Sequence, residues 1–435
     1  MFLANRTLLC VALICAAAAR ADWADYRGPW GIGYAAAPGD DKKIGLPIKW
    51  SESENVKWKT PIPHKGWSSP IIMGKQIWLT TATEDGHDFF VICADTDSGK
   101  ILFNEKLFHS DSPEPLGNDV NSYASPSATI EPGRVYVHFG SYGTACLDTK
   151  TFKTLWKRED LQCRHFRGPG SSPILYRNLL ILTMDGIDLQ YLTALDKQTG
   201  KTIWKTNRTA EWNDFGKDGE PERGGDFRKT YTTPLIVESG GVTRMISPGS
   251  KAAYAYDPMT GGEIWKINHA GFSCATRAVT YKDLAFFATG SGKTEYLAVP
   301  LDSRGTIAGT NVIWRTTRSA PRLPSPVVVG DLLYLLADSG VVRCVEAATG
   351  DEVWQERIGG EYYASLLYAD GNIYAFNQDG KATVLKTGRK FEVVATNTLA
   401  AGFMASPAVD GKALILRTKT HLYRIETGTT SASAK

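Results

Sequence analysis

One turn motif recurs along this chain and limits the folds that it can adopt. The motif is Ala-x-Asp-x-x-Thr-Gly-x-x-x-Trp, complete at residues 194–204 and 255–265, with looser copies near residues 93–103, 146–156 and 344–354. Its Asp can bond its side chain to turn amides, its Gly can take a positive φ without a Cβ clash, and its Trp supplies a large flat group for packing between layers. Five copies of a strand–turn–strand unit indicate a repeat fold. The positions assigned to this structural motif are Asp95, Asp148, Asp196, Gly200, Trp204, Asp257, Gly261, Trp265, Gly350 and Trp354.

A longer unit surrounds each turn. A Ser/Thr-Pro step such as Ser69-Pro70 opens a short strand, two apolar strands follow, and the turn and the aromatic strand close the unit. Eight such starts are followed by only seven closing strands, so the last unit, near residues 420–426, is one strand short. The strand around Trp58 stands before all the others, and pairing it with the last unit closes a ring without a free sheet edge.

The pattern therefore predicts an all-β, eight-bladed β-propeller of four-stranded antiparallel blades, closed by pairing an N-terminal strand with the C-terminal blade. An open solenoid would leave the strand around Trp58 unexplained. Two units depart from the motif, around residues 296–314 and 386–391, and we expect Phe391 to mark the closing strand of the second.

We divide the chain into four parts. Residues 1–21 resemble a secretory signal, with an apolar run and a small-x-small cleavage site at Ala19-Arg20-Ala21. Residues 22–53 are a lead-in that wraps a surface, residues 54–426 form the propeller, and residues 427–435 are a flexible tail. The apolar run is too short for a comfortable membrane anchor, and no later segment looks transmembrane. We expect an exported monomer in the periplasm or cell envelope.

Composition and the absence of known motifs argue against several classes of function. The formal net charge is +3 and the basic residues are scattered, so nothing suggests a nucleic-acid partner. The mature chain keeps five cysteines without a CxxC or haem-attachment spacing. No nucleophile elbow, zinc-binding His-Glu-x-x-His or phosphate-binding glycine loop is visible. We therefore expect no catalytic residues and no metal site. Two long insertions, at residues 104–122 and 207–230, carry carboxylates that could ligate Ca²⁺, but no EF-hand spacing is present, which favours solvated loops.

The loops before the first strands should meet on one face around the central channel. Aromatic residues stand two positions before four of the eight starts, and arginines lie nearby. This combination predicts either a site for an anionic, sugar-like or peptide ligand, or a packed plug of the channel entrance. The predicted ligand-binding residues at the channel mouth are Trp67, Tyr123, Arg167, Tyr231, Arg277, Arg322 and Tyr363.

The Asp–Thr-Gly–Trp motifs resemble those of quinoprotein-type, PQQ-binding-like repeat propellers, over nearly all of residues 55–426. Their non-enzymatic members are periplasmic propellers of the outer-membrane assembly factor B (BamB) type. The resemblance implies a binding or assembly scaffold without a cofactor, whose partner is an envelope protein or a wall or glycan ligand.

Two enzymatic alternatives remain open. The same resemblance also covers oxidoreductases that bind pyrroloquinoline quinone (PQQ) and Ca²⁺. It would give Asp119, Arg167, Asp226 and Trp67 as candidate parts of such a site, but the adjacent cysteine pair of the alcohol dehydrogenases is missing. The other alternative is carbohydrate chemistry on a carboxylate pair such as Asp226 and Glu361.

Overall fold

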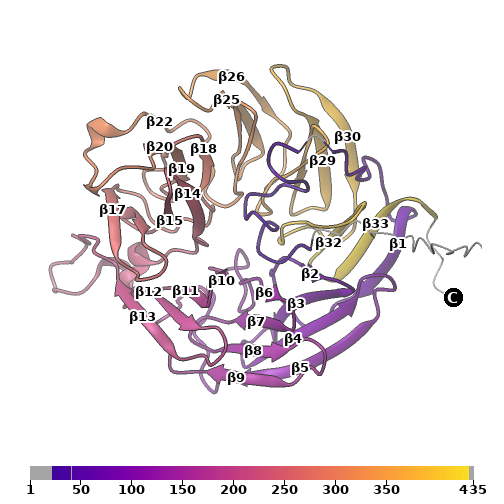
Figure 1. The fold of residues 1–435 in the computed structure, drawn as a ribbon, viewed down its shortest axis with the longest axis horizontal. Coiled ribbons are helices and arrows are strands. Elements are labelled where there is room, and N and C mark those ends of the chain that lie inside the picture. The colour runs from indigo at the N-terminus through magenta and orange to yellow at the C-terminus, as the bar shows by residue number, and fades with distance from the viewer. Residues whose placement is uncertain (1–21, 41, 431–435) are drawn as a thin grey trace, which may run out of the picture.

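The computed structural model describes residues 22–40 and 42–430, which form a closed ring of eight sheets (Figure 1). The predicted fold class is confirmed. Blade 1 comprises β2 (Ile71–Met73), β3 (Gln76–Ala82), β4 (Asp88–Asp95) and β5 (Ile101–His109). Blade 2 comprises β6 (Thr129–Glu131), β7 (Arg134–His138), β8 (Thr144–Asp148) and β9 (Thr154–Arg158). Blade 3 comprises β10 (Ile174–Tyr176), β11 (Leu179–Asp185), β12 (Gln190–Asp196) and β13 (Thr202–Asn207).

The same order continues around the ring. Blade 4 comprises β14 (Leu235–Ser239), β15 (Val242–Pro248), β16 (Ala252–Tyr256) and β17 (Glu263–Asn268). Blade 5 comprises β18 (Val279–Tyr281), β19 (Leu284–Ala288), β20 (Tyr296–Pro300) and β22 (Trp314–Thr316). Blade 6 comprises β23 (Val327–Val329), β24 (Leu332–Leu336), β25 (Val341–Glu346) and β26 (Glu352–Arg357). Blade 7 comprises β27 (Leu367–Ala369), β28 (Asn372–Phe376), β29 (Lys381–Lys386) and β30 (Val393–Thr398).

Blade 8 closes the ring as predicted. Its inner strands are β31 (Ala408–Asp410), β32 (Ala413–Arg417) and β33 (His421–Thr430). The outermost strand is β1 (Glu54–Pro61), which pairs antiparallel with β33. Because Glu54 lies opposite Thr430, the strand continues past residue 426, where the sequence placed the end of the propeller.

The repeated tryptophans fasten each blade to the next. The Trp204 indole donates to the Pro258 carbonyl in the following turn, and its ring lies against Gly261. Gly261 has a φ of +71°, and an added Cβ would stand 2.6 Å from that ring, so the turn needs glycine for both conformation and space. Equivalent indole bonds reach a carbonyl in the next blade from Trp58, Trp156, Trp265, Trp314 and Trp354.

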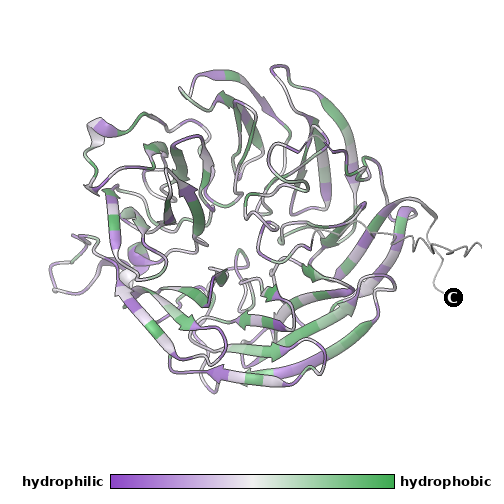
Figure 2. Cartoon of the chain, in the orientation of Figure 1, coloured by the Kyte–Doolittle hydropathy of each residue, from purple (hydrophilic) through white to green (hydrophobic). Residues whose placement is uncertain are grey.

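The inner and outermost strands of a blade differ in hydropathy. The second strand β11 is buried along its whole length, whereas the outermost strand β13 is mostly exposed and buries Trp204 alone. Figure 2 shows the same contrast, with green inner strands and mixed outer ones. The side chains between neighbouring blades therefore form the core, as expected for strands that are buried on both faces.

The two units that depart from the motif do so for different reasons. In blade 5 the chain leaves after β20, adds the short parallel strand β21 (Gly305–Thr306) beside β17 of blade 4, and returns through the 3₁₀ turn η2 (Gly309–Asn311). In blade 7 the prediction for Phe391 is wrong. Phe391 precedes the strand β30 and packs edge-on against Trp354, with ring centroids 5.3 Å apart.

The lead-in crosses the ring from one side to the other. Trp23 pairs with Ile72 of blade 1, and Ala24 accepts a bond from Ile130 of blade 2. Farther along, Tyr34 pairs with Tyr368 of blade 7, and the Trp50 amide donates to Asn397. The segment therefore contacts blades 1, 2 and 7 before it reaches β1, and its indigo trace lies between blades 1 and 7 in Figure 1. The predicted signal, residues 1–21, lies outside the described residues. Within them, no helix has the length and hydrophobicity of a membrane span.

Candidate ligand-binding site at the channel mouth

A ring of hydroxyl groups surrounds the axis where the first strands begin. Each contributing Ser or Thr side chain accepts a bond from the backbone N–H of the neighbouring blade, at 2.8 to 3.0 Å. The repeated Ser/Thr-Pro step of the sequence thus has a structural role. Blade 2 uses the serine after the proline. The ring hydroxyls belong to Ser69, Ser127, Ser172, Thr233, Ser325, Ser365 and Ser406.

Blade 5 breaks this ring and holds the lead-in instead. Its ring position is Arg277, which has no hydroxyl to accept from blade 4. The Arg277 guanidinium is buried and donates to the carbonyls of Pro234 and Tyr26, at 3.0 and 2.6 Å, and lies 3.3 Å from Asp25. The Tyr26 hydroxyl is 3.0 Å from the hydroxyl of Ser365, which stands at the start of blade 7. The lead-in therefore forms a floor across the channel.

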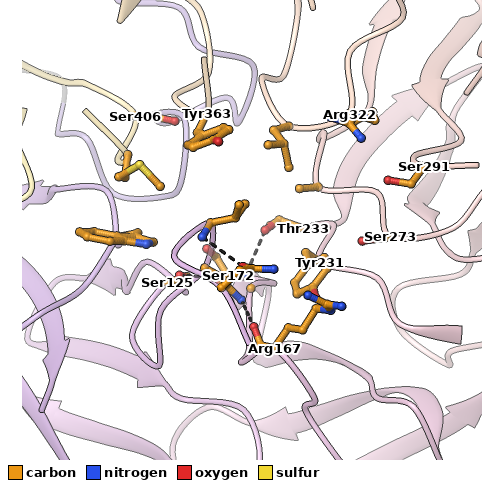
Figure 3. Close-up of a pocket in the computed structure, with 18 of the residues that line it drawn as sticks. Ser125, Arg167, Ser172, Tyr231, Thr233, Ser273, Ser291, Arg322, Tyr363 and Ser406 are labelled. Carbon is orange, nitrogen blue, oxygen red and sulfur yellow. Dashed lines mark hydrogen bonds between the residues drawn. The ribbon is translucent and has the colours of Figure 1, made fainter. Parts of the chain in front are cut away.

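Above this floor lies a cavity of about 460 Å³, whose wall includes Tyr26. Five of the seven predicted mouth residues line it: Trp67, Arg167, Tyr231, Arg322 and Tyr363 (Figure 3). The loops before blades 3 and 4 position Arg167 and Tyr231, and the loops before blades 6 and 7 position Arg322 and Tyr363 on the other side.

The other two predicted mouth residues do not lie on the cavity wall. Arg277 takes the place of the ring hydroxyl in its blade, and its guanidinium bonds the carbonyls of Pro234 and Tyr26 in the floor of the channel. Tyr123 is buried beneath the insertion that precedes blade 2, where its hydroxyl donates to the Glu114 carbonyl at 2.7 Å and its ring packs against Phe89. The sequence could not show that this insertion folds back over the tyrosine.

The charges of the wall are mainly positive. Asp226 is contacted by Arg167 at 3.5 Å and by Arg223 at 3.3 Å, and Arg322 bonds Asp338 at 2.7 Å. These contacts involve three arginines and two carboxylates, so the cavity wall keeps a net charge of one positive unit. Burial raises the pKa of the Tyr231 phenol, and nearby Asp226 adds to this effect. Burial and Glu361 raise the pKa of Tyr363 to about 12, so both phenols are neutral hydrogen-bonding groups at ordinary pH.

Both long insertions rise at this face. Asn118 and Val120 of the first line the cavity, as do Arg223 and Asp226 of the second. The second contains the turn η1 (Glu222–Arg228) and is stabilised by a buried pair in which Arg228 donates to both Asp214 oxygens. Next to this pair Phe215 is 61% exposed. The insertions therefore build part of the cavity rim, and the second also carries an exposed aromatic side chain. Their length was the sequence signal for this role.

A buried polar cluster lies near the cavity. Lys229 is 2.7 Å from His165 Nδ1, and the other ring nitrogen, Nε2, is 3.3 Å from the Cys163 sulfur. Burial lowers the pKa of Lys229 to about 8 and raises that of Cys163 to about 12. Burial, with Lys229 beside it, also holds the pKa of His165 well below its usual range. Cys163 and His165 also line a second groove of about 420 Å³, which sequence reasoning missed because neither residue belongs to a motif.

The residues of the cavity do not fit a Ca²⁺-dependent quinone site. Calcium takes about six to eight oxygen ligands. Among the described residues of the wall, Asp226 is the one carboxylate and is bound by two arginines, while the Asn121 amide donates to the carbonyls of Arg167 and Pro169. Of the candidate quinone residues, Asp119 lies outside the wall, where it pairs with Lys65 and is 95% exposed. Within the described chain, no group of three His, Cys, Asp or Glu side chains is placed to hold a metal.

The structure also separates the carboxylates of the carbohydrate alternative. Asp226 belongs to the cavity wall, whereas Glu361 is exposed and does not line the cavity. The Glu361 carboxylate accepts bonds from Tyr363 and Gln378. The two residues precede blades 4 and 7, and no shared site brings them together.

Comparison with known proteins agrees with the geometry. The fold and turns define an eight-bladed propeller of PQQ-like repeats. The sequence profile described as outer membrane protein assembly factor BamB matches residues 50–214 and 189–433, so the chain belongs to this family. One curated relative, BamB of Burkholderia pseudomallei (strain K96243), is 27% identical over 106 residues, which are 22% of this chain and 27% of that protein. The chain thus matches about a quarter of this relative's length.

Solved structures share the fold at low identity. BamB from Moraxella catarrhalis has a TM-score of 0.58 at 12% identity, covering 85% of this chain and 99% of its own. A europium-containing methanol dehydrogenase has a TM-score of 0.63 at 11% identity, covering 94% and 90%. Quinohemoprotein alcohol dehydrogenase from Comamonas testosteroni has a TM-score of 0.64 at 11% identity, covering 95% and 82%. The neighbours that share this fold therefore include both a BamB and dehydrogenases.

Proposed function

We propose that this protein is an exported, non-enzymatic scaffold of the cell envelope, which binds a protein partner through the face that carries the cavity. The observation that carries the proposal is the pair of insertions at the cavity mouth. They expose Phe215 and Val120, at 61% and 43%, on a rigid ring, and aromatic side chains on such loops are typical anchors of protein interfaces. Membership of the BamB family supports an envelope partner that takes part in outer-membrane protein assembly.

Site-specific photo-crosslinking in the source organism tests this function. A photoreactive amino acid at Phe215 should give a discrete crosslinked species containing an envelope protein of the assembly machinery. The matched control is Ile203, which is 52% exposed on the outermost strand of blade 3 and away from the mouth. Equal crosslinking from both positions, or crosslinks only to cytosolic proteins, would contradict the proposal.

A separate titration addresses the quinoprotein alternative. We expect no binding heat when the mature protein, residues 22–435, is titrated with PQQ in the presence of Ca²⁺. The physical reason is the lack of convergent oxygen ligands on the cavity wall. Tight, Ca²⁺-dependent binding would overturn this expectation and the scaffold proposal together.

A further inference from the structure

The cavity above the lead-in floor has a wall with an excess of hydrogen-bond donors. The ring hydroxyls on the wall already accept a backbone N–H, and within the described residues their own protons have no acceptor. Donors without acceptors are satisfied by water or by an acceptor-rich ligand. The ring hydroxyls on the cavity wall are those of Ser69, Ser127, Ser172, Thr233 and Ser406.

The arginines of the wall keep donors of their own. Arg322 uses its Nε on Asp338, and Arg167 contacts Asp226 through its Nε. No acceptor for the terminal guanidinium nitrogens of either residue is present in the described part of the chain. The terminal nitrogens of each guanidinium suit a carboxylate, which a guanidinium group binds with two parallel bonds, and the wall keeps one positive charge over.

The cavity wall also carries three aromatic rings. Trp67, Tyr231 and Tyr363 come from three different blades, and Figure 3 shows Tyr231 and Tyr363 on different sides of the cavity. Such rings pack against the flat C–H face of a sugar. The cavity is closed below by Tyr26, so a polymer cannot thread the channel and the ligand is a small molecule or a chain end.

We infer that the cavity binds a saccharide carrying a carboxylate, with the carboxylate at Arg322 and the sugar ring among the aromatic residues. The cavity volume of about 460 Å³ lies within the roughly 300–1,000 Å³ range of small-molecule sites. This inference deepens the proposed binding function of the same face, but its test needs no protein partner. A negative titration therefore leaves the crosslinking result untouched, and the reverse also holds.

Calorimetric titration of the mature protein with D-glucuronate, D-glucose and acetate tests the inference. We expect glucuronate to bind at least about 10-fold more tightly than either of the others, because it alone offers both the ring and the charge. Equal affinity for acetate would show a general anion site, equal affinity for glucose would show that the arginines play no part, and no binding of glucuronate would refute the site. Each of these results overturns the inference.

Variants locate the site. Arg322→Met should weaken glucuronate binding about 10-fold, because one charge-assisted bidentate contact is lost. The matched control is Arg357→Met, an exposed arginine on the outermost strand of blade 6, which should bind as the wild type does. A further measurement does not depend on any variant. Raising the salt to about 0.5 M should weaken glucuronate binding but leave glucose unaffected. An unchanged Arg322→Met affinity, or salt-independent glucuronate binding, would contradict the assignment.

Discussion

The outer turns and the cavity face of this propeller differ in how strictly they repeat. At the outer turns, Asp196 accepts bonds from Gln198 and Thr199, and Asp148 does the same with Lys150 and Thr151. At the cavity face, the residues two positions before the Ser/Thr starts differ from blade to blade, and one of the eight ring positions is Arg277 instead of a Ser or Thr. Repetition therefore marks the residues that hold blades together. Departures from it mark the residues that shape the floor, the wall and the rim.

The largest effect should come from breaking a repeated contact. Trp265 is fully buried between blades 4 and 5 and donates to the Leu301 carbonyl. Trp265→Ala should lower the free energy of unfolding by about 3–5 kcal/mol, because it leaves a large cavity between two sheets. Urea unfolding followed by fluorescence measures this loss. Trp67→Ala, at the half-buried cavity position, is the matched control and should cost less than half as much. Equal losses would erase the distinction between the two regions.

The next largest effect should come from Arg277, the ring position of blade 5 that holds the lead-in. Arg277→Met removes the buried cation that fixes Tyr26 and Asp25 and leaves their acceptors unpaired. We expect a loss of about 2–3 kcal/mol, below the usual cost of breaking a fully buried pair because Asp25 is partly exposed. Limited proteolysis should also cut residues 22–53 faster. Arg322→Met, on the exposed rim, should change neither quantity, and equal proteolysis of the two variants would argue against the floor.

Acid should act on the cavity side of the blades more than on the outer turns. Burial, with a smaller contribution from Lys229, lowers the pKa of His138 to about 3, and its Nδ1 lies 2.8 Å from the Thr144 hydroxyl. Below pH 6.5 the unfolded chain takes up a proton that folded His138 does not, so stability is complete above pH 6.5 and falls as the pH drops toward 3. At about pH 5 this one residue should cost about 2 kcal/mol.

His138→Gln isolates this contribution. The variant should lose less stability than the wild type when the pH is lowered from about 7 to 5, measured by urea unfolding at each pH. The outer-turn variant Asp148→Asn is the comparison, because its carboxylate is exposed and titrates below this range. A steep acid loss that is the same in wild type and His138→Gln would assign the effect to other groups, such as His269, whose pKa burial lowers to about 4.

Sequence reasoning reached the fold because local rules repeat. An Asp, a Gly with positive φ and a Trp recur at fixed offsets, and the unmatched strand around Trp58 required a partner. Phe391 misled it because that residue is aromatic and lies near the expected strand, yet it packs on Trp354 from the preceding loop. Hydrophobicity alone did not distinguish a strand residue from a loop residue that covers the neighbouring blade.

The cavity was predictable only in part. Positions two residues before each Ser/Thr start converge by repetition, and this placed Trp67, Tyr231 and Tyr363 around one cavity. The floor was not predictable, because the lead-in has no repeat to align it and is held by Arg277 and Ser365 from distant blades. Long-range contacts of a non-repeating segment leave no periodic signal in the sequence.

The smallest effect should come from a single outer turn. The Asp196 side chain accepts bonds from two amides and the Thr199 hydroxyl, and this hydroxyl is the main reason that its pKa is lowered. Asp196→Ala should cost about 1 kcal/mol, since exposed hydrogen bonds contribute little net stability each. Gly200→Ala in the same turn should cost more than Asp196→Ala, because a Cβ there would stand 2.8 Å from Trp156. A lower urea midpoint for Gly200→Ala than for Asp196→Ala would show that the contact between blades contributes more stability than the hydrogen bonds of the turn. The reverse order would assign the larger contribution to the turn.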